Sequence, residues 1–416
     1  MLKYSPMKKI FFLFAVLYSV GTQAQVKILF DATKAQTAGN ADWVLDADAW
    51  DLGWTPNAVV SSSHTGANPQ RIPTPAQSGI TASTPETYWK GALSNWGIDC
   101  VKKGYTVETL PYNGSITYGN TSNAQDLSNY KVFIVDEPNI KFTTAEKTAL
   151  MNFVQNGGGL FMISDHTVSD RNNDGWDSPA IWNDFMTTNS IQANPFGISF
   201  DLQNFSETSS NVVAVASDSI IHGPMGSVTQ VKWSNGTSMT LTPSANSSVK
   251  AVVYKTSSAA GNSNALVAYA RYGSGKVAAI GDSSPADDGT GNPNATLYNG
   301  YTGDANGNHQ KLLMNITIWL ATSNAVSTSV ATVDNNNNVQ VFTNLTSNAV
   351  CIKSARTLIQ PTLSIYDLEG QLIYTTSFAS ITGVQLAKPT IISPGVYLAV
   401  LSYGKNNIQK KIYLQP

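Results

Sequence analysis

Acidic side chains follow directly after four apolar stretches of this 416-residue sequence. They are Asp31, Asp136 with Glu137, Asp165 with His166, and Asp282. The carboxyl ends of parallel strands meet at one edge of an open sheet, where ligands bind, so we expect these groups to converge in one crevice. The alternative is that each acid caps the helix that follows it, as Asp often does.

Several carboxylates in one crevice repel one another, and a bound divalent cation relieves that repulsion. Asp and His are normal ligands for zinc and magnesium, and carboxylates suit calcium. We predict that Asp165, His166 and Asp282 hold a metal whose bound water attacks the substrate. Asp136 or Glu137 would then be the general base. The predicted catalytic residues are Asp136, Glu137, Asp165 and His166, and further candidate ligands are Asp31, Asp288 and His309.

Without a metal, the same acids would suit a glycosidase pair, in which two carboxyl groups flank the bond that is cleaved. A Ser–His–Asp triad is a further alternative because Ser164, Ser283 and Ser284 lie near these motifs. No G-x-S-x-G motif supports that triad.

A second motif runs from Asp170 to Asp177. Its D-x-N-x-D-G spacing matches the start of an EF-hand-like calcium loop, in which alternating oxygen side chains face one ion. The predicted ligands are Asp170, Asn172 and Asp174. Position twelve is Ile181, so the bidentate acid is missing and Asp177 is the nearest substitute. A polar loop that borders the crevice is the alternative.

Aromatic residues on the predicted loops favour a glycan substrate, because their rings can stack on sugar rings. The candidates for substrate binding are Trp54, Trp176, Tyr298 and Tyr301.

The charge content argues against some partners. Only 12% of residues are charged and the formal net charge is −2, so the chain has no broad basic field for nucleic acid or anionic membranes. Its two cysteines, Cys100 and Cys351, are too few for a disulfide scaffold or a thiolate zinc site.

The elements that must position the acids alternate between strands and helices. Buried strands are predicted at 26–31, 131–136, 159–164 and 275–281. Helical spacing is found at 88–96 and 309–320, and a Thr143–Glu146 capping box starts a third helix. Apolar strands without alternation predict a parallel sheet with helices on both faces.

The chain divides into modules. Residues 1–24 have a positive flank, a short apolar core and a small-residue end, as in a signal peptide; the core is too short to span a membrane. Residues 25–321 form the predicted α/β domain, and 322–340 form a linker rich in Ser, Thr and Asn. Residues 341–416 contain short alternating strands, which predict a small antiparallel β-sandwich.

The C-terminal module resembles the type IX secretion sorting domain of Bacteroidetes. The matching segments are Leu363–Asp367 with Gly370, Pro394–Tyr397 and Gln409–Leu414. The resemblance implies handling by the type IX secretion machinery, a route through the periplasm and the outer membrane, and a secreted or cell-surface location. The tail is usually cleaved in such proteins.

The larger domain resembles the class I glutamine-amidotransferase-like domains, which are flavodoxin-like, of secreted bacterial proteins. The matching segments are Phe153-Val154 with Gly157–Ile163, His222–Pro224, Tyr272–Val277 and Gly281–Ser284. Amidotransferases place a nucleophilic cysteine after the strand at 159–164, where this chain has Asp165-His166. Thiolate hydrolysis of glutamine is therefore excluded.

Together these features predict a secreted, metal-assisted hydrolase that acts on an extracellular glycan or related polymer. The alternative is a non-catalytic carbohydrate- or surface-binding protein with structural calcium.

Overall fold

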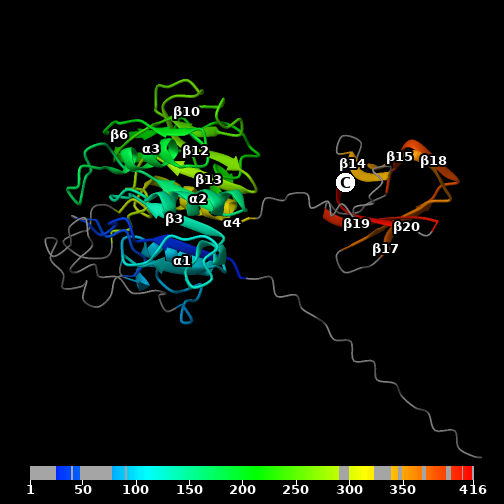
Figure 1. The fold of residues 1–416 in the computed structure, drawn as a ribbon, viewed down its shortest axis with the longest axis horizontal. Helices are drawn as coiled ribbons and strands as arrows, with labels where there is room; N and C mark the ends of the chain where they lie inside the picture. Colours follow the sequence, from blue (N-terminus) through cyan, green and yellow to red (C-terminus); the bar gives the residue numbers. More distant parts are fainter. Residues whose placement is uncertain are drawn as a thin grey trace, which may run out of the picture. The chain divides into compact units, whose positions relative to one another are not determined.

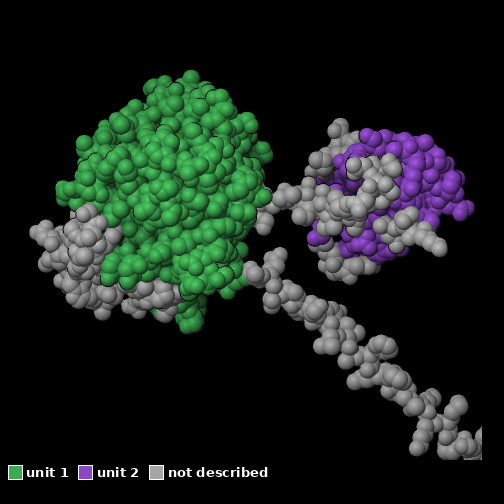
Figure 2. All heavy atoms as spheres, viewed as in Figure 1, with its two compact units in different colours: residues 1–324 green, residues 325–416 purple. Residues whose placement is uncertain are grey.

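The computed structural model describes residues 25–38, 41–46, 77–89, 91–289, 299–322, 339–344, 349–367, 372–389, 395–404 and 406–414. The chain divides into two compact units, residues 1–324 and 325–416 (Figure 2). The predicted signal peptide and residues 323–338 of the predicted linker lie outside the described residues.

A mixed sheet forms the centre of the first unit (Figure 1). Its parallel strands are β1 (Lys27–Asp31), β2 (Thr106–Leu110), β3 (Val132–Asp136), β4 (Gly159–Ile163) and β13 (Gly275–Ile280). They lie in the order β2-β1-β3-β4-β13, which is the flavodoxin-like order. The predicted flavodoxin-like α/β class is thus confirmed.

The sheet continues beyond β13 with antiparallel strands. These are β5 (Ile198–Phe200), β10 (Met239–Leu241), β11 (Lys250–Tyr254) and β12 (Ala265–Tyr272). The prediction of a parallel sheet is therefore correct for one half only. Two residues, Gly273 and Ser274, join β12 to β13, and so short a connection permits only an antiparallel pair. Gly273 has a φ of +56°, which suits such a turn.

Two helices cover each face of the sheet. They are α1 (Ser94–Lys102), α2 (Thr144–Gln155), α3 (Ser178–Thr188) and α4 (Asn308–Ala321). Buried residues of α1 and α4 share one apolar cluster with Phe30 and Phe161 of the sheet. Those of α2 and α3 share the other with Leu29 and Leu160. Adjacent residues of one strand thus face opposite helical layers, as a two-sided sheet requires.

Minor elements complete the first unit. They are the 3-10 helices η3 (Glu86–Tyr88), η4 (Leu127–Asn129) and η5 (Ala305–Gly307), and the strand pairs β6 (Phe205–Ser209) with β9 (Val231–Gly236) and β7 (His222–Gly223) with β8 (Gly226–Ser227). Among the described residues, no helix combines the length and apolar character that a membrane span needs.

The helix starts illustrate where local sequence signals suffice. Thr143 and Glu146 form the predicted capping box, with Thr143 N donating to Glu146 Oε2 at 2.8 Å. The helix predicted at 88–96 begins later, at Ser94. The amide groups of Ala92 and Leu93 donate to the carbonyl oxygens of Asp42 and Val44, so this segment pairs with another loop instead of coiling.

Trp96 of α1 contacts both the sheet and the neighbouring helix on one face of the first unit. Its fully buried ring lies edge-on to Phe30 of β1 and Phe161 of β4, with centroid distances of 5.2 and 5.6 Å. Its Nε1 donates to Thr317 Oγ1 of α4 at 3.1 Å. One side chain thus connects α1, the sheet and α4.

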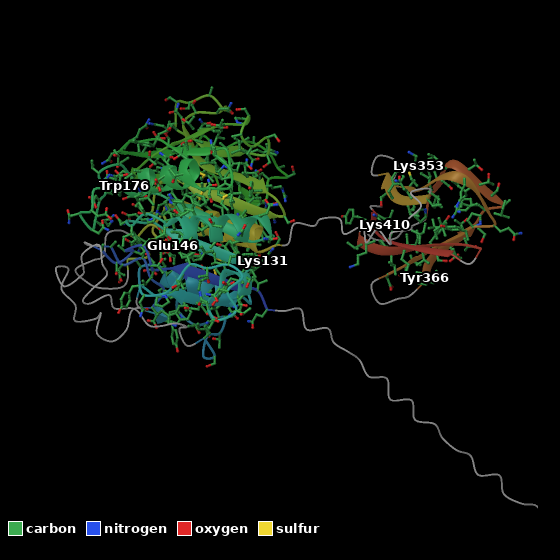
Figure 3. All side chains as sticks on the ribbon, viewed as in Figure 1. Lys131, Glu146, Trp176, Lys353, Tyr366 and Lys410 are labelled. Atoms are coloured by element: carbon green, nitrogen blue, oxygen red, sulfur yellow. The ribbon has the colours of Figure 1, made fainter. Side chains whose placement is uncertain are left out.

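The described residues of the second unit form two antiparallel sheets. One contains β14 (Val339–Asn344), β15 (Ala349–Ile359) and β18 (Ser380–Ala387); the other contains β16 (Thr362–Tyr366), β17 (Leu372–Ser377), β19 (Gly395–Tyr403) and β20 (Asn406–Leu414). The core of this unit contains apolar residues of both sheets, such as Ile352 of β15, Leu363 of β16 and Leu401 of β19. Lys353 and Lys410, labelled in Figure 3, are not part of that core. The predicted β-sandwich is confirmed.

We predict that Trp96→Ala lowers the free energy of unfolding of the first unit by about 3–5 kcal/mol, because it leaves a large cavity and removes the bond to Thr317. Denaturant titration followed by tryptophan fluorescence measures this, since all nine tryptophans precede residue 322. Trp96→Phe keeps most of the packing and should cost less. Equal, small losses for both variants would contradict the role given to Trp96.

Candidate functional site

Four buried acids lie where three adjacent parallel strands, β3, β4 and β13, end. Asp136 is the last residue of β3, Glu137 follows it, and Asp165 and Asp282 come two residues after β4 and β13. Each is at most 2% exposed. Because β3, β4 and β13 are adjacent and parallel, all four groups meet at one edge of the sheet, as expected. We call Asp136, Glu137, Asp165 and Asp282 the carboxyl cluster.

Glu137 has an unusual backbone and a tightly held side chain. Its φ is +38°, in the left-handed region that non-glycine residues rarely adopt. Its Oε2 accepts from Trp43 Nε1 at 2.7 Å and from Ser283 Oγ at 3.1 Å, and its Oε1 accepts from Arg171 Nε. Backbone strain kept in place by surrounding contacts is concentrated at functional sites in proteins.

Asp165 lies beside Glu137 and close to the side chains of Arg171 and His166. Its Oδ2 is 3.5 Å from Arg171 Nη2 and 3.6 Å from His166 Nε2. Burial raises the pKa of Asp165 well above its ordinary value; the negative charges of Glu137 and Asp282 raise it further, and Arg171 opposes them. Burial and these negative charges therefore favour the protonated form of Asp165.

Asp136 has no hydrogen-bond donor among the described residues, and only the charge of Arg171 counters the rise in its pKa. Both of its carboxylate oxygens are buried and lack a hydrogen-bond partner there. Burial raises its pKa well above the ordinary value, and the charges of Glu137, Asp287 and Asp282 add to this effect. A buried ionised carboxylate without partners is costly, so Asp136 favours the protonated form or a bound cation.

Asp282 and Asp31 have more partners. Asp282 accepts from the amides of Ser284, at 2.8 Å, and Ser234, and burial raises its pKa to about 7 despite these bonds. At the same sheet edge, Asp31 accepts from Thr33 and Gln36, and burial raises its pKa to about 6. The pKa values of Asp282 and of the neighbouring Asp31 are thus raised toward neutrality, which suits proton transfer.

His166 lies at the outer side of the cluster. Its Nδ1 is 2.6 Å from the carbonyl oxygen of Thr167 and 2.9 Å from Asn204 Nδ2. The side chains of His166 and Arg171 are 17% and 15% exposed, whereas that of Asp165 is 3% exposed. A substrate that approaches this edge therefore meets His166 and Arg171 first.

In the predicted calcium loop, the side-chain oxygens of Asp170 and Asp174 accept hydrogen bonds from other residues of the same loop. Both Asp170 oxygens accept from the amides of Asp174 and Gly175, and Asp174 accepts from Trp176 N and Asn172 Nδ2. Asn172 Oδ1 is buried and has no hydrogen-bond partner within the described part of the chain. Throughout the described residues, no group of three or more His, Cys, Asp or Glu side chains is arranged to hold a metal ion.

Two candidate ligands have structural roles. His309 Nδ1 donates to the carbonyl oxygen of Gly300 and its Nε2 accepts from Lys232 N, both at 2.9 Å. Asp288 Oδ2 accepts from Asn95 N in the first turn of α1 at 2.7 Å. Because these donor and acceptor atoms are already used, we leave both residues out of the proposed site.

The predicted aromatic contacts have different outcomes. Tyr301 is fully buried and its hydroxyl donates to Asp99 at 2.9 Å, so its ring is not open to a sugar and that expectation is corrected. Trp176, labelled in Figure 3, is partly buried, with Lys141 Nζ 3.9 Å from its ring centroid. Trp54 and Tyr298 lie outside the described residues.

Sequence reasoning missed the partners of Glu137. Trp43 precedes Glu137 by 94 residues and Arg171 follows it by 34, so no local pattern connects them. The one available signal was an arginine close to Asp165-His166 in a chain with few charges.

Cys100 lies buried in α1, where burial raises the pKa of its thiol.

The comparisons with known proteins define the class of the tail. Residues 340–415 match the family of the secretion system C-terminal sorting domain. This match shows the predicted type IX sorting domain and marks the chain as a secreted or cell-surface protein. A search of curated proteins finds no match to the chain.

Solved structures resemble the chain only distantly. The N-terminal domain of mmIFT52 is 14% identical, with a TM-score of 0.40, over 71% of this chain and 98% of that one. A ThuA-like protein from Parabacteroides merdae is 12% identical, with a TM-score of 0.34, over 72% and 90%. A β-galactosidase from Halorubrum lacusprofundi is 13% identical, with a TM-score of 0.33, over 87% and 41%. Likeness at this level carries no functional argument.

The burial of Asp136 predicts a pH-dependent effect of Asp136→Asn. An acid whose pKa is raised by folding stabilises the fold below its unfolded pKa, near 3.8, and that stability is lost as pH rises through the folded value. The amide cannot ionise, so we expect the variant to be more stable than the parent by about 1–3 kcal/mol at pH 8.

Thermal unfolding of both proteins from pH 4 to pH 8 tests this expectation. The difference should be small at pH 4, where the parent carboxyl is protonated. A variant that is less stable than the parent across the whole range would contradict the uncompensated burial of Asp136.

Proposed function

We propose that the first unit is an exported hydrolase whose carboxyl cluster performs acid–base chemistry. The observation that carries this proposal is the pair formed by Glu137 and Asp165. Glu137 is fully buried and held by three donors on a left-handed backbone. Asp165, from the adjacent strand end, lies beside it with a raised pKa.

The two acids have different environments and so suit different roles. Trp43, Ser283 and Arg171 all donate to Glu137, which favours it as the proton acceptor of the pair. Asp165 favours its protonated form, which suits a general acid that protonates a leaving group. Pairs of acids whose environments separate their protonation states are the usual acid–base arrangement in hydrolases.

An extracellular glycan or related polymer is the substrate class that we propose. Its support is the sorting tail, which is typical of exported proteins. Glu137 and Asp165 are in direct contact, closer than the two carboxyl groups that flank a glycosidic bond, so the pair itself does not select this bond. A cavity of about 150 Å³ is lined by Ser234, Ser284 and His309. It lies near Asp282, which accepts from the amides of Ser234 and Ser284, but no acid of the cluster lines it. The proposed export route is the type IX machinery, through the periplasm.

Substitution of the pair tests the proposal. Glu137→Gln and Asp165→Asn should each lower hydrolysis of soluble polysaccharides by about 10²–10⁴-fold, because each removes one proton-transfer group. Release of reducing ends measures the rate. Glu207→Gln, in β6 and outside the carboxyl cluster, is the matched control and should retain full activity. Folded variants with unchanged rates, or a parent without activity on any polysaccharide tried, would contradict the proposal.

A second candidate is a protein that binds a divalent cation, such as calcium, magnesium or zinc, for structural or catalytic use. One observation favours it: the two buried oxygens of Asp136, near Asp282 and Asp287, have no hydrogen-bond partner among the residues that the structure describes. Hard cations bind such oxygens. The described donors do not form a ready set of ligands, so we derive no catalytic step from a metal. A non-catalytic carbohydrate- or surface-binding protein with structural calcium belongs to this candidate.

Metal analysis distinguishes the candidates. If a cation binds the cluster, the purified protein should contain about one equivalent, chelation should lower its unfolding temperature, and Asp136→Asn should abolish both effects. If no calcium, magnesium or zinc copurifies, and none of them raises the unfolding temperature of the parent, the cation candidate is wrong.

A further inference from the structure

A groove of about 660 Å³ lies on the antiparallel half of the first unit. Its lining includes Asp218, Lys250, Asn262, Tyr269, Arg271 and Trp319. None of these residues belongs to the carboxyl cluster. The volume falls in the range of small-ligand sites in proteins and exceeds that of the cavity beside Asp282.

The strand register places cations and an aromatic ring on one face. Lys250 of β11 pairs with Tyr269 of β12, so their side chains project on the same side. Arg271 lies two residues after Tyr269 and shares that side. From α4, Trp319 lies edge-on to Tyr269 at 5.1 Å, and the Arg271 guanidinium is 5.9 Å from the Trp319 ring.

Asp218 is the one carboxylate among the described residues that line the groove, and both of its oxygens accept hydrogen bonds from the protein. Asp218 Oδ1 accepts from the amides of Ile220 and Ile221, and its Oδ2 accepts from the Tyr269 hydroxyl at 2.6 Å. Lys250 and Arg271 are both exposed. The groove therefore presents two cations beside aromatic rings, with the acid directed into the fold.

Further positive charge lies beneath the groove. Arg271 pairs directly with Lys276 of β13, an arrangement that like charges disfavour. Burial, together with the positive charges of Arg271 and Lys131, lowers the pKa of Lys276 to about 8. An anion bound at Arg271 would relieve this repulsion.

We propose that this groove binds an anionic saccharide, with Lys250 and Arg271 contacting its acidic groups and Tyr269 contacting the sugar ring. A sugar ring fits the adjacency of cations and aromatic faces, and the exposed amide of Asn262 suits its hydroxyl groups. Carboxylate and sulfate groups share this chemistry. The groove is distinct from the carboxyl cluster and holds a polymer without cleaving it.

Binding of defined polysaccharides to the full chain tests the proposal. We expect titration calorimetry at low salt to show binding of polygalacturonate, of dextran sulfate, or of both, and no binding of neutral dextran. The two anionic polymers distinguish carboxylated from sulfated ligands. Lys250→Ala with Arg271→Ala should weaken binding at least tenfold, whereas Lys250→Arg with Arg271→Lys should retain most of it.

Control variants separate this site from net charge and from the proposed hydrolase. Lys103→Ala, an exposed cation just after α1, should leave binding unchanged, and so should Glu137→Gln. Tryptophan fluorescence verifies that each variant is folded. No binding of either anionic polymer, or equal binding by the double alanine variant, overturns the proposal whatever the outcome of the hydrolysis assays.

Discussion

The burial of four carboxyl groups at one sheet edge is the constraint on which the rest of the site depends. Asp136, Glu137, Asp165 and Asp282 lie together at the ends of three adjacent strands, and Arg171 is the cation that contacts two of them. Isolated buried charges are too costly to keep, so these acids must share donors, protons or a cation. The neighbouring elements supply donors to Glu137 and Asp282 and leave Asp136 without any among the described residues.

The scaffold provides this arrangement from distant parts of the chain. Trp43 comes from the loop after β1, Arg171 from the segment before α3, and Ser283 from the turn after β13. All three converge on Glu137, which has a φ of +38° and whose backbone N–H donates a hydrogen bond to the carbonyl oxygen of Ile163 in β4. A strained residue fixed by three independent elements is what a preorganised acid–base site requires.

Much of the scaffold follows from sequence because its signals are local. Apolar strands that end in acids, and the capping box of α2, predict both the sheet and the edge where the acids meet. The antiparallel pairing of β12 with β13 follows from the two-residue turn at Gly273. The periodicity of apolar residues in the sequence does not reveal this strand direction. His309 and Asp288 form hydrogen bonds with backbone groups of other segments. Their residue types suggested metal ligands, because the sequence does not show these long-range bonds.

The central claim is that the carboxyl cluster lacks enough positive charge to remain fully ionised. Infrared difference spectroscopy of the carbonyl stretch of protonated carboxyl groups, on chelator-treated protein between pH 5 and pH 9, tests it most directly. The account predicts a protonated-carboxyl signal that persists at neutral pH and weakens in Asp136→Asn and Asp165→Asn. Complete ionisation of all carboxyl groups by pH 5 would contradict it.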